Sequence, residues 1–210
     1  MRSGNDLSGW WKMSKKITIE MVRDVNCSPE ILSEVLKRQK NDWISCCAAR
    51  NPNCPPKALK MVVEMGKNDE VSCYAAGNSN CPTETLKMVV EMGKDDTVRR
   101  YATYNLNCPP EALKSELKQG KNDPVSREAA KNPNCPAEVL QMVLERKKND
   151  LVSWCATHNH NCPPQARLKW LMAIGRIKTP DLSKHDVQVI KDYNKPDEEW
   201  EQFKRMVEDE

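Results

Sequence analysis

The sequence predicts an all-α protein in which two-helix units stack into an array, and two observations support this prediction. Cysteine followed by proline, or by Ser-Pro, recurs every 27 residues. Apolar residues within the units, such as Leu59, Val62 and Val63, follow the i, i+3, i+4 spacing of a helix that buries one side. Because one helix pair cannot enclose a core of its own, units of fixed length bury their apolar stripes by stacking on one another. The recurring cysteines are Cys27, Cys54, Cys81, Cys108, Cys135 and Cys162.

The first helix of each unit is expected to begin at the recurring cysteine. We predict that Cys108 is an N-cap and that Pro109 and Pro110 fill the first helical positions, which need no amide donor. Glu111 then takes the third position of a capping box. Because cysteine is a poor N-cap, burial explains its recurrence better than hydrogen bonding does. Glycine in the left-handed conformation is expected to end three of these helices, at Gly66, Gly93 and Gly120.

The second helix of each unit is expected to begin at an aspartate that recurs with the same period. Asp123-Pro124 is the clearest case, because aspartate is a preferred N-cap and proline suits the first helical position. Each helix continues through small alanines to a recurring asparagine, which we expect to satisfy backbone groups at the turn between units. The aspartates are Asp42, Asp69, Asp96, Asp123 and Asp150, and the asparagines are Asn51, Asn78, Asn105, Asn132 and Asn159.

The repeat divides the chain into three parts. We interpret residues 1–26 as an N-terminal extension with a half-unit cap, and residues 27–176 as the repeat solenoid, with five full units and a degenerate sixth. Residues 177–210 are interpreted as a helical cap with an acidic tail, containing helices at 183–193 and 196–206. Such caps close the open ends of a stacked core.

Composition and patterning exclude two classes of protein. No apolar run approaches the ~18 residues of a membrane-spanning helix, because charged residues interrupt every stretch. Residues 1–16 lack the apolar block of an export signal. We therefore expect a cytoplasmic protein with no membrane partner, whose ten cysteines are reduced thiols.

Two strings of the repeat resemble the leucine-rich repeat variant family: VRRYA at residues 98–102, leading to Asn105, and NPNCPAEVL at residues 132–140. The resemblance covers residues 17–171 and implies a right-handed superhelix of α-helices alternating with shorter α or 3₁₀ helices, as in HEAT and armadillo arrays. This chain departs from the family in its longer unit and in its Val-Arg pair, which survives only at Arg99. Some relatives carry an iron–sulfur cluster on N-terminal cysteines, but residues 1–26 contain none, so we expect no cofactor.

Function is expected where the units differ, because the shared residues build the scaffold. If Val71, Tyr74 and Ala75 face inward, the 100° helical step turns residues 73 and 77 outward. The same two positions in the other units give Cys46/Arg50, Arg100/Tyr104, Arg127/Lys131 and Trp154/His158. We predict a partner-binding ridge, defined as Arg50, Arg100, Tyr104, Arg127, Lys131, Trp154 and His158.

The ridge favours a protein-binding module whose partner is another protein or an acidic peptide, anchored by aromatic side chains. The alternative is nucleic acid, held by cations and stacked on rings. Against it, the four units from Asn51 to His158 carry net charges of 0, 0, +1 and 0, whereas nucleic-acid binders are plainly basic. The same deficit argues against a HEAT-like DNA-acting enzyme. No phosphate loop or nucleophile elbow occurs, so we expect no catalysis and no catalytic residues.

Cysteines and methionines leave three further alternatives. A zinc site would require Cys155, His158, His160 and Cys162 to converge, and helical register separates them. Cys46-Cys47 could be redox-active, but both match repeat positions that favour buried thiols. Methionine pairs on two first helices either contact the adjacent unit or form a patch for a partner or a second copy. These methionines are Met61, Met65, Met88 and Met92.

Overall fold

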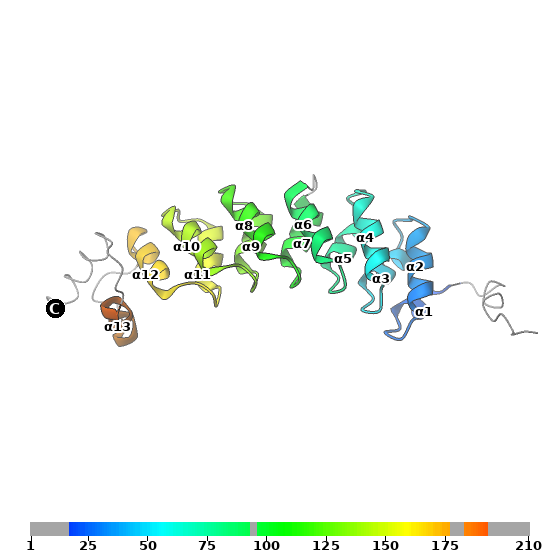
Figure 1. Ribbon diagram of the computed structural model, residues 1–210, viewed down its shortest axis with the longest axis horizontal. Helices are drawn as coiled ribbons and strands as arrows, with labels where there is room; N and C mark the ends of the chain where they lie inside the picture. The colour runs from blue at the N-terminus through cyan, green and yellow to red at the C-terminus, as the bar shows by residue number, and fades with distance from the viewer. Residues whose placement is uncertain (1–16, 93–95, 177–182, 193–210) are drawn as a thin grey trace, which may run out of the picture.

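The computed structural model describes residues 17–92, 96–176 and 183–192, which form thirteen helices in an elongated row (Figure 1). The helices are α1 (Ile19–Arg23), α2 (Pro29–Lys37), α3 (Trp43–Arg50), α4 (Pro56–Glu64), α5 (Glu70–Gly77), α6 (Thr83–Met92), α7 (Asp96–Tyr104), α8 (Pro110–Lys118), α9 (Pro124–Lys131), α10 (Ala137–Glu145), α11 (Leu151–His158), α12 (Pro164–Ala173) and α13 (Lys184–Asp192).

The helices follow the repeat predicted from the sequence. From α2 to α12 they begin 13 or 14 residues apart, so that two helices fill each unit. Each even-numbered helix packs against the odd-numbered helix that follows it, and from α1 to α12 each helix packs against its counterparts in the adjoining units. The colours of Figure 1 run along the row without doubling back, which places consecutive units side by side. The prediction of an all-α repeat array is confirmed at this level.

The core follows the two rows of helices. The even-numbered helices contribute fully buried leucines such as Leu59, Leu86 and Leu113, each of which gains about 1.5–3 kcal/mol from burial. The odd-numbered helices contribute alanines, among them Ala75 and Ala102, which have no exposed surface. Their small side chains let successive odd-numbered helices lie close together.

Four of the five second helices begin at the predicted aspartate cap. Asp42, Asp69, Asp123 and Asp150 are N-caps, and each carboxylate accepts a hydrogen bond of 2.8–2.9 Å from the amide of the residue three positions later. Pro124 occupies the first turn of α9. Asp96 is different, because it is the first residue of α7 and its carboxylate accepts from the Arg99 guanidinium.

The predicted cap of the first helices is wrong by one residue. The N-cap of α8 is Pro109, which makes no side-chain hydrogen bond, and Cys108 precedes it. The Cys108 amide donates to the Asn105 carbonyl at 2.9 Å and its side chain is fully buried, so the thiol packs in the core instead of capping the helix. Burial therefore accounts for this cysteine. The N-cap of α2 is Ser28, whose side chain accepts a hydrogen bond from the Ile31 amide. The N-caps of α4, α8, α10 and α12 are prolines and make no side-chain hydrogen bond.

The recurring asparagines join each unit to the one before it. The Asn105 side-chain amide donates to the carbonyls of Ala76 and Asn78, both at 2.8 Å, and its oxygen accepts from the Asn107 amide at 2.9 Å. The other four asparagines repeat this arrangement. The expectation that they satisfy backbone groups is confirmed. A second row, which the sequence analysis did not predict, lies alongside: Asn53, Asn80, Asn107, Asn134 and Asn161 also donate to the preceding unit.

Left-handed residues end the first helices at a fixed register. Gly66 and Gly120 have φ of 60° and 69°, as predicted, while Gly93 lies outside the described residues. At the same position, Gln39 and Lys147 adopt φ of 53° and 52°. The turn geometry is thus kept even where glycine is absent.

At the C-terminal end, α13 packs against α12. Ser183 and Asp186 form a capping box, in which the Ser183 hydroxyl accepts from the Asp186 amide at 3.1 Å and the Asp186 carboxylate accepts from the Ser183 amide at 3.2 Å. The helix predicted at 196–206 lies outside the described residues.

Of the predicted methionine pairs, Met61, Met65 and Met88 pack against the core and Met92 is exposed. Among residues 17–92, 96–176 and 183–192, every helix is too short or too polar to span a bilayer.

Candidate binding surface on the second helices

The predicted ridge lies on α3, α7, α9 and α11, which belong to one row of helices. Five of its side chains are exposed: Arg50, Arg100, Tyr104, Lys131 and His158. Arg127 and Trp154 are half-buried.

The two cysteines predicted to face outward at the start of this register are buried instead. Cys46 and Cys73 are 2% and 7% exposed. The Cys46 thiol lies 3.9 Å from the Glu70 carboxylate of the next second helix, so a short side chain at this position stays between the helices. Only longer side chains, such as Arg100, extend from the same register to the surface. The register position of Cys46 and Cys73 therefore contributes to the ridge only from α7 onward, where Arg100 occupies it.

At the N-terminal end of the ridge, Arg50 is held by an aromatic pair. Its guanidinium carbon lies 4.9 Å from the centre of the Tyr74 ring, and Tyr74 meets Tyr101 edge to face at 6.1 Å. A Cβ on Gly77 would come within 3.0 Å of the Tyr101 ring, so glycine makes room for this tyrosine. Tyr74, which was predicted to face inward, is half-buried and contacts Arg50, and the repeat pattern gave no signal of this contact.

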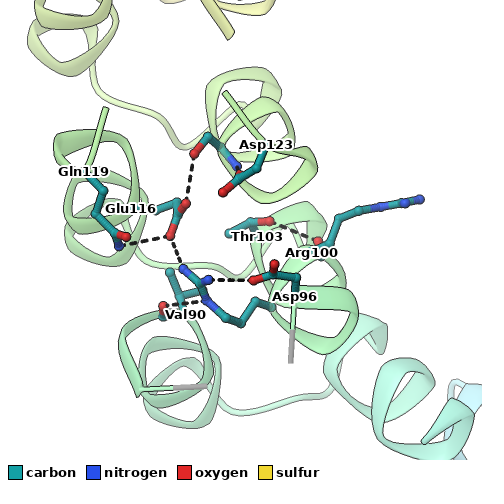
Figure 2. Close-up of polar contacts among 9 residues, drawn as sticks. Val90, Asp96, Arg100, Thr103, Glu116, Gln119 and Asp123 are labelled. Carbon is teal, nitrogen blue, oxygen red and sulfur yellow. Dashed lines mark hydrogen bonds and ion pairs between the residues drawn. The ribbon is translucent and has the colours of Figure 1, made fainter. Parts of the chain in front are cut away.

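In the middle of the ridge, cations and an aromatic ring are presented to solvent. Tyr104 is 68% exposed at the end of α7. Figure 2 shows the Arg100 side chain extending away from Asp96 and Glu116. The Arg127 Nε donates to the Asp123 carbonyl at 3.2 Å, and Lys131 Nζ lies 3.7 Å from Glu128 Oε1. Such an exposed ion pair contributes little to stability, so Lys131 can exchange it for another carboxylate.

At the C-terminal end, Trp154 is fixed by its neighbours. It meets Trp170 edge to face at 5.4 Å, and the Arg176 guanidinium lies 5.3 Å from its ring centre. His158 Nδ1 is 2.8 Å from the Trp154 carbonyl oxygen. A hollow of about 280 Å³, lined in part by Trp154, His158 and Leu171, lies beside them.

A buried charge cluster lies directly behind Arg100, and sequence reasoning missed it. Arg99 stands where α3, α5, α9 and α11 have serine, and Glu116 stands where α2, α4, α6 and α10 have valine. The two side chains form an ion pair, with side-chain exposures of 8% and 0%.

The remaining hydrogen-bonding capacity of this pair is used within the cluster. The Arg99 guanidinium also donates to Asp96 at 2.9 Å and to the Val90 carbonyl at 3.2 Å. The Glu116 carboxylate accepts from the Ser126 hydroxyl at 2.9 Å and from the Gln119 amide at 3.3 Å. Figure 2 shows Glu116 at the centre of these contacts. Two departures from the repeat thus compensate each other. The signal was present in the sequence as two simultaneous exceptions in adjoining units.

The cysteines are buried thiols. None of the ten forms a disulfide, eight are buried, and Cys155 and Cys162 are half-buried. Burial raises the pKa of Cys54 and Cys108 from the ordinary value of about 9 to about 12, because the thiolate would lose its hydration. Burial and the Glu70 charge raise the pKa of Cys46 to about 11. Within residues 17–92, 96–176 and 183–192, no three His, Cys, Asp or Glu side chains gather as a metal site would require.

No protein-family model, curated protein or solved structure matches this chain. The repeat architecture and the side chains that it exposes are therefore the basis for assigning a function.

Proposed function

We propose that the protein is a non-catalytic binding scaffold that uses the ridge of its second helices to hold another protein. The scaffold is a right-handed superhelix of the leucine-rich repeat variant type. The observation that carries the proposal is the exposed row of Arg100, Tyr104 and Lys131 on two neighbouring helices. Aromatic and arginine side chains are the residues that contribute most to protein interfaces.

The backbone beneath the ridge supports this role. Each second helix ends at an asparagine that is hydrogen-bonded to two carbonyls of the preceding unit. The spacing between Tyr104 and Lys131 is therefore held by buried hydrogen bonds. A surface held in this way loses little conformational entropy when a partner binds.

A protein partner fits the charge of the ridge better than nucleic acid does. The cations Arg100, Arg127 and Lys131 form a local cluster in units that are nearly neutral. Leu106, which is 68% exposed, adds an apolar side chain next to Tyr104. An isolated group of cations beside apolar surface suits acidic residues that flank an apolar anchor, whereas a nucleic-acid backbone needs an extended basic track.

Charge reversal tests the proposal. The triple variant Arg100→Glu, Arg127→Glu, Lys131→Glu should lose the proteins that the wild type retains from a nuclease-treated lysate of the source cells, measured by quantitative mass spectrometry. The matched control reverses three exposed lysines away from the ridge: Lys57, Lys118 and Lys121. If the ridge variant retains the same proteins as the wild type, the ridge is not the binding surface. If binding disappears on nuclease treatment alone, nucleic acid is the ligand.

A further inference from the structure

A hollow of about 340 Å³ opens across three successive units at the ends of α5, α7 and α9. Two register positions line it in each unit: the last residue of the second helix and the second residue after it. These residues are Gly77 and Ser79, Tyr104 and Leu106, and Lys131 and Pro133.

One of the three units that line the hollow carries small residues at both positions. The first position is Arg50, Tyr104, Lys131 or His158 in other units, but it is Gly77 here. The second position has Ser79 where the next unit has Leu106. The Tyr101 ring lies against Gly77, and the small Ser79 side chain leaves space beside Tyr104 and Leu106 of the next unit.

The asparagine side chains that line the hollow already donate their hydrogen bonds within the fold. The Asn105 side-chain amide donates to two carbonyls, and the Asn132 side-chain amide donates to the carbonyls of Thr103 and Asn105 at 2.7 and 3.0 Å. These amide protons are used within the fold, so apolar contact with Tyr104 and Leu106 is what the hollow offers a ligand. Both side chains are 68% exposed and gain free energy when covered.

The charges around the hollow have one predominant sign. Lys131 lies on its rim, and Glu128, which also lines it, is the carboxylate 3.7 Å from Lys131. Arg100 and Arg127 lie one helical turn before Tyr104 and Lys131, on the same helix faces. One cation and one carboxylate therefore line the hollow, and two further cations lie one helical turn away on the same helices.

We propose that this hollow receives one large apolar side chain of a protein partner, and that acidic residues on either side of that anchor pair with Lys131, Arg127 and Arg100. The inference rests on the proposed function and names the kind of segment that the ridge binds. The volume is roughly ten times the ~30 Å³ occupied by one water molecule, which is enough for an aromatic or leucine side chain.

The substitution Ser79→Leu fills the hollow with a side chain that the repeat already carries at Leu106. The backbone carbonyl of Ser79, which accepts from the Asn107 side-chain amide, is retained in this variant. His160→Leu is the matched control, because His160 is exposed and has the same register three units later. Far-UV circular dichroism and the melting temperature of each variant establish that it folds.

The probe is a displayed library of random twelve-residue peptides, selected on the wild-type chain. We expect enriched sequences that contain one Trp, Phe or Leu flanked by Asp or Glu. As a fluorescein-labelled synthetic peptide, the most enriched sequence should bind the Ser79→Leu and Lys131→Glu variants at least about tenfold more weakly than the wild type, measured by anisotropy. It should bind the His160→Leu variant as it binds the wild type.

Three results overturn the inference: no enrichment on the wild type, enrichment of basic or purely polar peptides, or equal affinity of the enriched peptide for the Ser79→Leu variant. The proposed function is judged separately. If the ridge charge-reversal variant loses its protein partners while Ser79→Leu keeps them, the ridge is the binding surface and the hollow is not its anchor site. Tighter binding of a labelled twenty-nucleotide single strand than of any selected peptide overturns both.

Discussion

The buried pair of Arg99 and Glu116 gives the sharpest test of how departures from the repeat are accommodated. Changing only Arg99→Ser leaves the Glu116 carboxylate fully buried, with Ser126 and Gln119 as its remaining donors. Changing only Glu116→Val leaves the guanidinium with Asp96 and the Val90 carbonyl. The double variant restores the serine and valine that the other units carry at these positions.

The expected magnitudes follow from the burial of the pair. Removing one member of a buried ion pair lowers the free energy of unfolding by about 3–5 kcal/mol, because an uncompensated charge stays in the core. Glu116→Val should fall at the lower end of this range, because Arg99 keeps its ion pair with Asp96. At about 2–4 °C per kcal/mol for a chain of this size, each single variant should melt roughly 6–20 °C below the wild type. In the double variant the serine can bond to Asp96, as Ser72 does to Asp69, and the valine packs as Val89 does. We therefore expect its stability to lie within about 1 kcal/mol of the wild type, or above it.

The assay is urea unfolding of the four proteins, followed by far-UV circular dichroism, and it forms a double-mutant cycle. A coupling free energy of about 3 kcal/mol or more would show that the two exceptions are one interacting unit. Additive losses, with the double variant less stable than either single variant, would refute the reasoning. Arg100→Ser is the control at the exposed neighbour and should change stability by less than about 0.5 kcal/mol.

The other predictions concern the asparagines and the thiols. Asn105→Ala removes two buried hydrogen bonds, so it should lower the free energy of unfolding by about 2–3 kcal/mol and the melting temperature by several degrees. Asn107→Ala, at an exposed site, should lower the free energy of unfolding by less. Equal losses in the two variants would contradict the unequal roles given to the two rows of asparagines. In native protein at pH 8, iodoacetamide should modify half-buried Cys155 well before Cys54, Cys81, Cys108 and Cys135, whose pKa burial raises to about 12; peptide mass spectrometry would detect the opposite order. Because these thiols keep their protons in the folded chain and lose them above about pH 9 when unfolded, the free energy of unfolding should fall as the pH rises from about 9 toward 12; a urea midpoint that stays constant over this range would argue against it.

The architecture could be predicted from the sequence because every unit repeats the same local signals. Asp123-Pro124 marks a helix start through the chemistry of those two residues alone, and the structure confirms it. The prediction that Cys108 is an N-cap was wrong because it considered only the local capping pattern. The side chain is buried in the core, and the N-cap is the next residue, Pro109. Periodicity shows that a residue recurs but does not distinguish a cap from a core position one residue away.

The candidate surface could be predicted only in part. Helical register placed Arg100, Tyr104 and Lys131 on one row of helices, and the structure exposes all three. The same register could not show that Cys73 would be buried, because side-chain length decides which residues at this position reach solvent. The hollow was not predicted because it depends on contacts across three units, which a position-by-position comparison of the repeat does not capture.

Because every unit makes the same asparagine contacts with the unit before it, one whole unit can be deleted without loss of these contacts in the remaining units. Removing 27 consecutive residues brings equivalent backbone positions together, so each remaining asparagine again finds two carbonyls in the unit before it. The central charge pair limits where the cut can be made. Deleting residues 90–116 removes Arg99 and Glu116 together. Deleting residues 78–104 removes Arg99 but leaves the Glu116 carboxylate buried without its cation. A scaffold whose modules are otherwise interchangeable therefore carries one junction at which shortening must remove both partners.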